Sequence, residues 1–127
     1  MASTTIFLTV EEVIQLHGQL IERFGGDGRV RDLGLVESAL ARPRSGYYTS
    51  LSEQGAALLQ SLIRNHAFVD GNKRVAFASC AIFLRLNGYR LTLDASAAEA
   101  FLVDRVIVGG ADVAEIASWL ESAMDAR

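Results

Sequence analysis

Apolar positions recur every three or four residues along most of the chain, which is the spacing of helices buried on one side. The clearest stretch is residues 10–24. Thr9 followed by Glu12 predicts a capping box at its start, and three glycines within residues 25–28 predict its end. The pattern therefore predicts an amphipathic helix near the N-terminus.

Two further helices are predicted in the first half of the chain. One begins at Asp32, its expected N-cap, and stops before Pro43, because proline disfavours helical backbone in the residue that precedes it. Residues 44–50 are polar and aromatic, which indicates a loop or a small hairpin. Ser52 is the expected N-cap of the next helix, which we expect to end near His66.

A fourth helix is predicted from Asn72 to Leu86. Residues 75–84 within it are apolar almost without interruption, so we expect it to be the central helix of the fold. The dipeptide Asn87-Gly88 predicts its end, since both residues tolerate left-handed backbone.

The last third of the chain predicts one short strand and two closing helices. Residues 89–93 alternate weakly between apolar and polar, which predicts a strand that pairs with residues 6–8. Asp94 and Asp112 are the expected N-caps of the helices. We therefore predict an all-α fold, a compact bundle of about six helices forming one domain over residues 1–127, with a minor β pairing or flap.

Composition narrows the functional classes. The 127 residues are 50% hydrophobic with a formal charge of −3, which indicates a globular domain and argues against a basic face for direct nucleic-acid binding. The longest apolar run, residues 75–84, is half the roughly 20 residues that span a bilayer, so we expect no membrane partner. With no secretory signal and a single cysteine, Cys80, a cytoplasmic protein is expected.

Polar residues suited to phosphate chemistry gather in residues 64–74, between two apolar helices. His66 can take a proton from a hydroxyl near neutral pH, and Asp70 offers a hard oxygen ligand suited to Mg²⁺. Taken singly, each has an ordinary structural explanation, a helix C-cap for the histidine and a turn for the aspartate. Their joint occurrence favours a catalytic site.

The next four residues complete the pattern of an anion site. Gly71 lets a phosphate approach the backbone, and the helix beginning near Asn72 has unpaired N–H groups at its positive end. Lys73, the only lysine of the chain, and Arg74 add a point charge and a bidentate fork. Such a set of base, metal ligand, anion hole and cations is typical of phosphoryl or nucleotidyl transfer.

The segment His-Ala-Phe-Val-Asp-Gly-Asn-Lys-Arg at residues 66–74 closely resembles the signature of the Fic/Doc family, His-x-Phe-x-Asp/Glu-Gly-Asn-x-Arg. Residues 24–26, 31–43 and 83–89 are also similar to Doc-type members. The resemblance implies an all-α core in which the motif forms a loop leading into a helix. It further implies a Doc-type toxin of a toxin–antitoxin system.

The resemblance also implies a role for each motif residue. His66 would be the general base and Asp70 the Mg²⁺ ligand. Gly71 and Asn72 would build the anion hole, and Arg74 would pair with a terminal phosphate of ATP.

Lys73 indicates which branch of the family the chain is similar to. AMP-transferring members usually have glycine at this position, whereas Doc-like members have lysine, which is thought to make ATP bind in reverse. The resemblance then implies a protein kinase that transfers the γ-phosphate, with Lys73 acting alongside His66 and Asp70. The family's best-known target is a threonine of elongation factor Tu, whose modification halts translation and growth.

The expected partner is a cognate, Phd-like antitoxin whose disordered C-terminal segment folds onto the toxin. Its groove would involve the first helix, where Leu16, Leu20 and Phe24 are candidates, although burial in the core is the favoured explanation for each of them. By the same likeness, Tyr47 and Tyr48 would lie in a flap over the substrate, although a simple lid on the core explains these loop aromatics equally well.

Two alternatives remain open. One is a Fic-type AMP transferase that modifies a protein hydroxyl despite Lys73. The other is a non-catalytic module that holds a nucleotide or a partner at the same helix end, for which a base and a metal ligand would be unnecessary.

Overall fold

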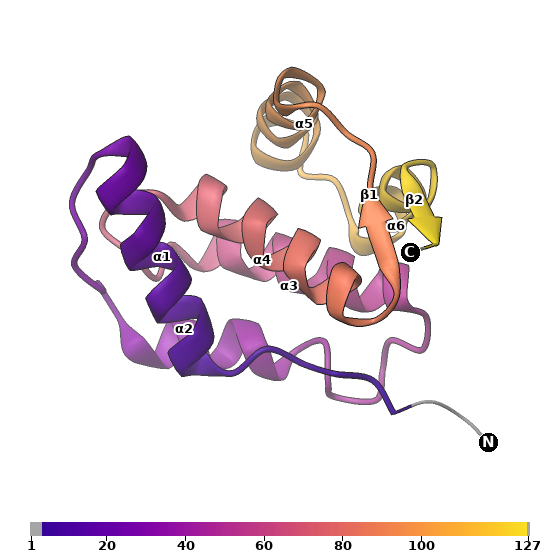
Figure 1. Cartoon of the computed structure of the whole chain (residues 1–127), viewed down its shortest axis with the longest axis horizontal. Helices are drawn as coiled ribbons and strands as arrows, with labels where there is room; N and C mark the ends of the chain where they lie inside the picture. Colours follow the sequence, from indigo (N-terminus) through magenta and orange to yellow (C-terminus); the bar gives the residue numbers. More distant parts are fainter. Residues whose placement is uncertain (1–3, 127) are drawn as a thin grey trace.

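The structure is a computed structural model that describes residues 4–126. Its elements follow the order α1 (Val10–Phe24), α2 (Leu33–Ala41), α3 (Leu51–Asn65), α4 (Asn72–Leu86), β1 (Tyr89–Leu91), α5 (Ala95–Phe101), the π-helix η1 (Leu102–Val108), α6 (Val113–Glu121) and β2 (Met124–Ala126). The predicted all-α bundle of six helices is confirmed, with η1 continuing α5 and one small two-stranded sheet (Figure 1).

The helix buried on all sides is α3. Every residue from Gln54 to Ile63 is buried, and α3 packs on α2, α4 and α6. Gly55 brings α3 close to α4, since a Cβ there would lie 3.4 Å from Cys80 Sγ. The prediction that α4 is the central helix is wrong. One side of α4 is open, and Ile82 is 37% exposed on it.

Most helix ends lie where the sequence placed them. The capping box of Thr9 and Glu12 is present, and three aspartates cap α2, α5 and α6 by accepting a backbone N–H, namely Asp32, Asp94 and Asp112. The prediction for Ser52 is wrong, because Ser50 and Glu53 form a complete capping box two residues earlier. Ser52 lies inside α3, where its hydroxyl donates to Glu121 (2.9 Å).

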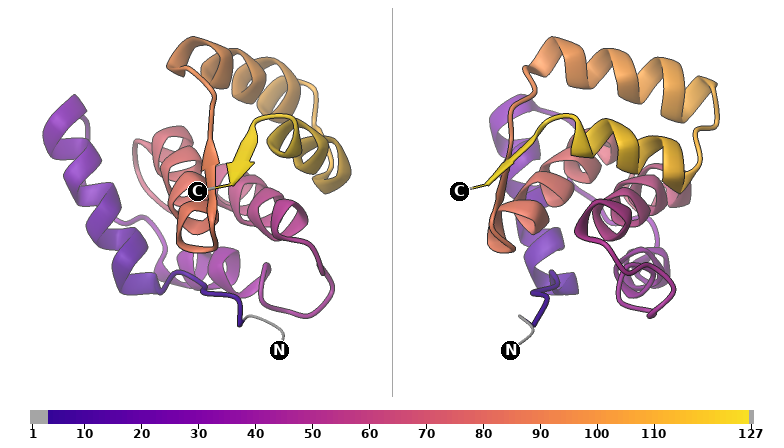
Figure 2. Two further views of the ribbon diagram at one scale, coloured as in Figure 1. Left: turned by 45° about the vertical axis from the view of Figure 1, so that its right-hand side comes forward. Right: turned by 90° about the vertical axis from the view of Figure 1, so that its right-hand side faces the viewer.

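The short strand exists, but its predicted pairing with residues 6–8 is wrong. β1 pairs antiparallel with β2, with Arg90 opposite Asp125, because the chain returns to β1 after α6 (Figure 2). Residues 6–8 lie near the start of β1 without pairing with it. The side-chain amide of Asn87 accepts from the N–H of Ile6 and donates to its carbonyl oxygen, both at 2.8 Å.

The helix formed by α5 and η1 lies beside α6 at one end of the bundle (Figure 2). The ring of Phe101 stacks on Trp119 with centroids 3.9 Å apart, and Arg105 pairs with Glu115 (2.6 Å). This helix therefore joins the bundle through a few side chains, unlike α3.

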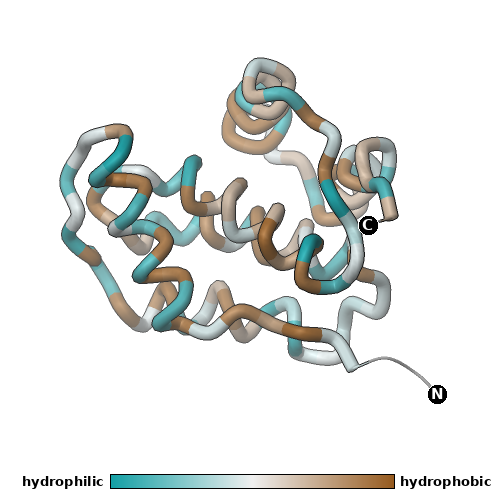
Figure 3. Tube along the Cα trace, in the orientation of Figure 1, coloured by the Kyte–Doolittle hydropathy of each residue, from teal (hydrophilic) through white to brown (hydrophobic). Residues whose placement is uncertain are grey.

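The hydropathy of the residues along the chain agrees with the packing of the helices. Brown apolar and teal hydrophilic positions alternate along α1, as expected for a helix with one buried side (Figure 3). Within residues 4–126, no helix combines the length and the apolar character needed to cross a membrane.

Candidate active site

The motif loop, residues 66–71, connects the end of α3 to the start of α4. His66 is the C-cap of α3 in the left-handed region (φ 49°, ψ 49°), where it is the only non-glycine residue with positive φ among residues 4–126. Arg31 donates from Nε to the carbonyl oxygen of His66 (2.6 Å) and from Nη2 to that of Asn65 (3.1 Å). These bonds complete the end of α3 and leave the side chain of His66 exposed.

The segment between α1 and α2 supports the motif loop along its length. The N–H groups of Arg31 and Asp32 donate to the carbonyl oxygen of Ala67 (2.8 and 3.0 Å). Val69 donates to the carbonyl of Arg29 (3.1 Å), and these bonds make an antiparallel bridge between residues 30 and 68. The loop is thus held as a short strand pairing, which the sequence did not predict.

A buried aromatic contact holds the motif loop from beneath. Phe68 is 1% exposed, and its ring stacks on that of His17 at 3.9 Å. His17 is equally buried and donates from Nε2 to the carbonyl oxygen of Asp70 (2.7 Å), so its proton must lie on Nε2. His17 is thus packed against the motif loop, and this packing fixes the loop.

Two motif residues shape the start of α4. The side chain of Asn72 bridges back to Phe68, accepting from its N–H (3.1 Å) and donating to its carbonyl oxygen (2.9 Å). Gly71 has φ 77°, and a Cβ there would lie 3.3 Å from Ile21 and 3.4 Å from His17. Both residues therefore set the backbone from which α4 begins. No side chain caps its first turn, which leaves the positive end of the helix open to an anion.

The carboxylate of Asp70 lies where the loop meets the α1–α2 segment. Its Oδ1 accepts from the N–H of Gly71 (2.8 Å), and its Oδ2 lies only 2.6 Å from where a Cβ of Gly26 would be. Within residues 4–126, no three His, Cys, Asp or Glu side chains gather to hold a metal. A cation at Asp70 would thus have one protein carboxylate, an arrangement that suits Mg²⁺ carrying phosphate oxygens.

The structure brings together all six residues predicted for the site. They line an open cleft of about 570 Å³, hereafter the motif cleft, whose lining is His66, Val69, Asp70, Gly71, Asn72, Lys73, Arg74 and Glu99. Glu99, on α5, is the member that sequence reasoning missed. It lies 26 positions beyond Lys73, and nothing in the local pattern marks it.

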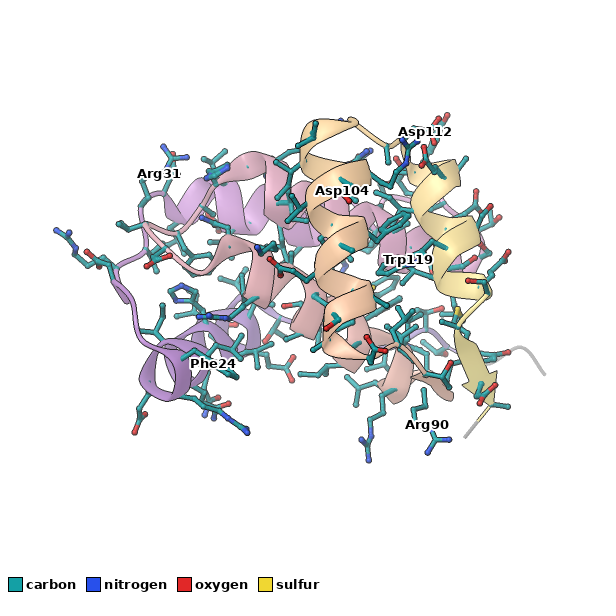
Figure 4. All side chains as sticks on the ribbon, turned by 90° about the horizontal axis from the view of Figure 1, so that it is seen from above. Phe24, Arg31, Arg90, Asp104, Asp112 and Trp119 are labelled. Atoms are coloured by element: carbon teal, nitrogen blue, oxygen red, sulfur yellow. The ribbon has the colours of Figure 1, made fainter. Side chains whose placement is uncertain are left out.

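The two cations of the motif are each held by a residue of another helix. Lys73 donates through Nζ to the carboxylate of Glu99. The guanidinium carbon of Arg74 lies 4.6 Å from the ring centroid of Phe24, at the end of α1, within reach of a cation–π contact. Figure 4 looks down on this side of the molecule, with Phe24 to one side of α5 and η1.

A second hollow adjoins the motif cleft. This apolar groove of about 330 Å³ is lined by Leu20, Phe24, Lys73, Arg74, Phe77, Ala78, Ala95, Ala98, Glu99 and Leu102. Three residues, Lys73, Arg74 and Glu99, line both hollows. The assignment of Phe24 to the core is wrong, since the residue is 54% exposed at the groove. Leu20 is half-buried there.

The expected place of the flap also needs correction. The segment in contact with the motif loop is residues 25–32, and the loop with Tyr47 and Tyr48 instead packs near α3 and the start of α6. Within residues 25–32, the exposed Arg29 guanidinium hydrogen-bonds to Asp27 and lowers the pKa of that carboxyl to about 2.

Comparisons with a family model and with known proteins agree with one another. The model of a family described as the Fic/DOC family matches residues 7–84. The Toxin Doc of Mycolicibacterium smegmatis is 45% identical over 103 residues, which cover 76% of this chain and 79% of that protein. The Protein kinase doc of Escherichia phage P1 is 39% identical over 88 residues, covering 66% of this chain and 70% of that protein.

Proposed function

The chain belongs to the Fic/DOC family, and from that premise we propose that it is a Doc-type toxin acting as a protein kinase on a hydroxyl group. ATP would be the phosphate donor, and its γ-phosphate the group transferred. One observation carries the proposal. An exposed histidine, a carboxylate, an uncapped helix N-terminus and two cations all line one cleft.

His66 is the proposed general base. Its left-handed position at the end of α3 exposes the ring at the motif cleft, where a target hydroxyl has access. A positioned base typically contributes about 10²- to 10⁴-fold to such a step. It would take the proton as the hydroxyl oxygen forms its bond to phosphorus and the bond to the departing nucleotide oxygen breaks.

The remaining motif residues would hold the phosphates. The backbone N–H groups of Gly71 and Asn72 lie at the positive end of α4, where Gly71 would exchange its bond to Asp70 Oδ1 for one to phosphate. Lys73 and Arg74 supply positive charge beside them. Mg²⁺ at Asp70 would neutralise charge on the transferred group. Lysine at position 73, in place of the glycine of AMP-transferring members, supports γ-phosphate transfer rather than AMP transfer.

The proposed target is a threonine of elongation factor Tu, whose phosphorylation in the cytoplasm would block translation and arrest growth. The phage relative named a protein kinase supports the reaction class. The similarity to a Doc toxin implies an antitoxin partner. We assign the apolar groove to the folding C-terminal segment of a Phd-like antitoxin, because the exposed ring of Phe24 and the apolar wall of α4 form its lining.

The test is label transfer in a bacterial lysate with Mg²⁺, using ATP labelled in parallel at the γ- or the α-phosphate. We expect γ-label on one dominant protein, lost on chelation of Mg²⁺ and at least 100-fold weaker with His66→Ala. The matched control is Tyr47→Ala, a change of an 83% exposed ring outside the motif cleft.

Other results would replace the proposal with one of its alternatives. Transfer of α-label would favour an AMP transferase, with Lys73 failing to set the orientation of the nucleotide. Binding of ATP without transfer of either label to any protein would favour a non-catalytic module.

A further inference from the structure

The single lysine of the chain is held by a residue outside the motif. Lys73 is the second residue of α4, and its ammonium group donates to Glu99 on α5. The two side chains are 34% and 57% exposed. A lysine side chain is long and flexible, so this contact selects one direction among many for the ammonium group.

Glu99 lies at the boundary between the motif cleft and the apolar groove and lines both. Among residues 4–126, the charged groups that line the motif cleft are two carboxylates, Asp70 and Glu99, and two cations, Lys73 and Arg74. Their formal charges cancel when His66 is neutral. A polyphosphate entering the cleft therefore meets a lysine whose charge is already countered.

We propose that Glu99 is a positioning residue that holds the Lys73 ammonium group at the boundary of the two hollows and thereby sets which phosphate of a nucleotide reaches the start of α4. The consequence for transfer rests on the proposed function. The positioning of Lys73 itself rests on the contact and on the place of Glu99 in both linings.

The variant Glu99→Gln separates positioning from a structural role. It keeps the size of the side chain and one oxygen acceptor but removes the negative charge, so the contact with Lys73 is weakened and the cleft gains one unit of positive charge. ATP should then bind more tightly, while the preference for γ-phosphate transfer falls. Loss of a merely structural contact would instead weaken binding.

The first measurement uses the fact that Lys73 is the only lysine. Protein labelled with ¹³C and ¹⁵N in lysine gives one side-chain Nζ signal in NMR, and that signal reports on Lys73 directly. We expect Glu99→Gln to move it toward the position of a freely rotating lysine. The charge-matched control is Glu37→Gln, an exposed residue of α2 outside both hollows, which should leave the signal unchanged.

The second measurement is calorimetric titration with ATP in the absence of Mg²⁺. We expect ATP to bind about two- to five-fold more tightly to Glu99→Gln than to Glu37→Gln, with the difference shrinking at high salt. In the label assay, the ratio of α- to γ-transfer should rise at least about two-fold, the lower end of the same range.

An unmoved lysine signal, or ATP binding to Glu99→Gln no tighter than to Glu37→Gln, would overturn the proposal. A moved signal with an unchanged label ratio would overturn the consequence for phosphate choice. If the wild-type protein transfers neither label, the proposed function fails, and the lysine signal and the titration still decide the role of Glu99.

Discussion

The motif loop and the two cations that follow it are held by different kinds of contact. Beneath the loop, Phe68 and His17 are each 1% exposed and stacked, and backbone bonds tie residues 67–69 to the α1–α2 segment. Lys73 and Arg74 instead depend on exposed side chains of α5 and α1.

The backbone of the motif loop must keep one geometry, whereas the side chains of Lys73 and Arg74 can change position. The general base and the N-terminus of α4 need a fixed backbone. Burial against the core fixes it, but makes these positions sensitive to substitution. Long charged side chains in water are steered by contacts of about 1 kcal/mol or less, which a ligand can displace. Four predictions test this contrast, from the largest expected effect to the smallest.

Removing the buried ring of Phe68 should destabilise the motif loop. Phe68→Ala deletes a fully buried ring and its stacking on His17, so we expect the free energy of unfolding to fall by about 3–5 kcal/mol. Urea unfolding measures it. Tyr47→Ala, an exposed ring, should change stability by less than about 0.5 kcal/mol. Similar losses for the two variants would contradict the contrast between fixed and exposed contacts.

A methyl group at Gly26 tests the junction between Asp70 and the α1–α2 segment. Gly26→Ala would place a Cβ 2.6 Å from Asp70 Oδ2 at φ 119°, so the carboxylate must move, and we expect phosphate transfer to fall about 10- to 100-fold.

Gly46→Ala is the matched control for that variant. It has a similar positive φ of 91° but no atom within 4 Å of the new Cβ. Both variants should lose roughly 1–3 kcal/mol of stability, and only Gly26→Ala should lose transfer. Equal transfer rates in the two would show that the place of Asp70 does not matter.

Substitutions at Phe24 test the exposed contact that holds Arg74. Phe24→Leu keeps an apolar side chain but removes the ring face beneath Arg74, so we expect ATP to bind about two- to five-fold more weakly by calorimetry. Phe24→Trp offers a larger face and should restore binding. A weakness that Trp fails to repair would mean that Phe24 acts through groove packing.

The smallest effect is expected for the exposed pair of Asp27 and Arg29. The folded-state pKa of Asp27, about 2, lies below its ordinary value, so the unfolded chain holds the proton more tightly. The pair therefore stabilises the fold above about pH 4, and that contribution disappears as pH falls toward 2. Arg29→Ala should raise the pKa of Asp27 in an NMR titration of carboxyl signals. It should lower the free energy of unfolding at pH 7 only slightly, because water screens the pair.

Local sequence signals predicted the helices well because they act within a few residues. The capping box at Thr9 and the aspartate caps of α2, α5 and α6 are all present, since an N-cap needs only its own first turn. The prediction of Ser52 as an N-cap was wrong, because Ser50 and Glu53 form a complete capping box within the first turn of α3. The motif residues were found together because they are contiguous in the chain.

Contacts between distant segments could not be predicted from the sequence. The pairing of β1 with β2, the bridge between residues 30 and 68, and the exposure of Phe24 all depend on how the helices pack. Sequence periodicity gave Phe24 a place on an apolar stripe, but it did not tell whether that stripe meets the core or the groove.

The sequence by itself determined the helices, the family signature and the set of groups available for phosphate chemistry, because propensity, capping and motif spacing are local. The tertiary structure alone decided the surroundings of that set. It placed Gly26 against the carboxylate of Asp70, Phe24 beneath Arg74 and Glu99 beside Lys73. Such contacts arise only when helices far apart in the chain pack together, so no local pattern encodes them.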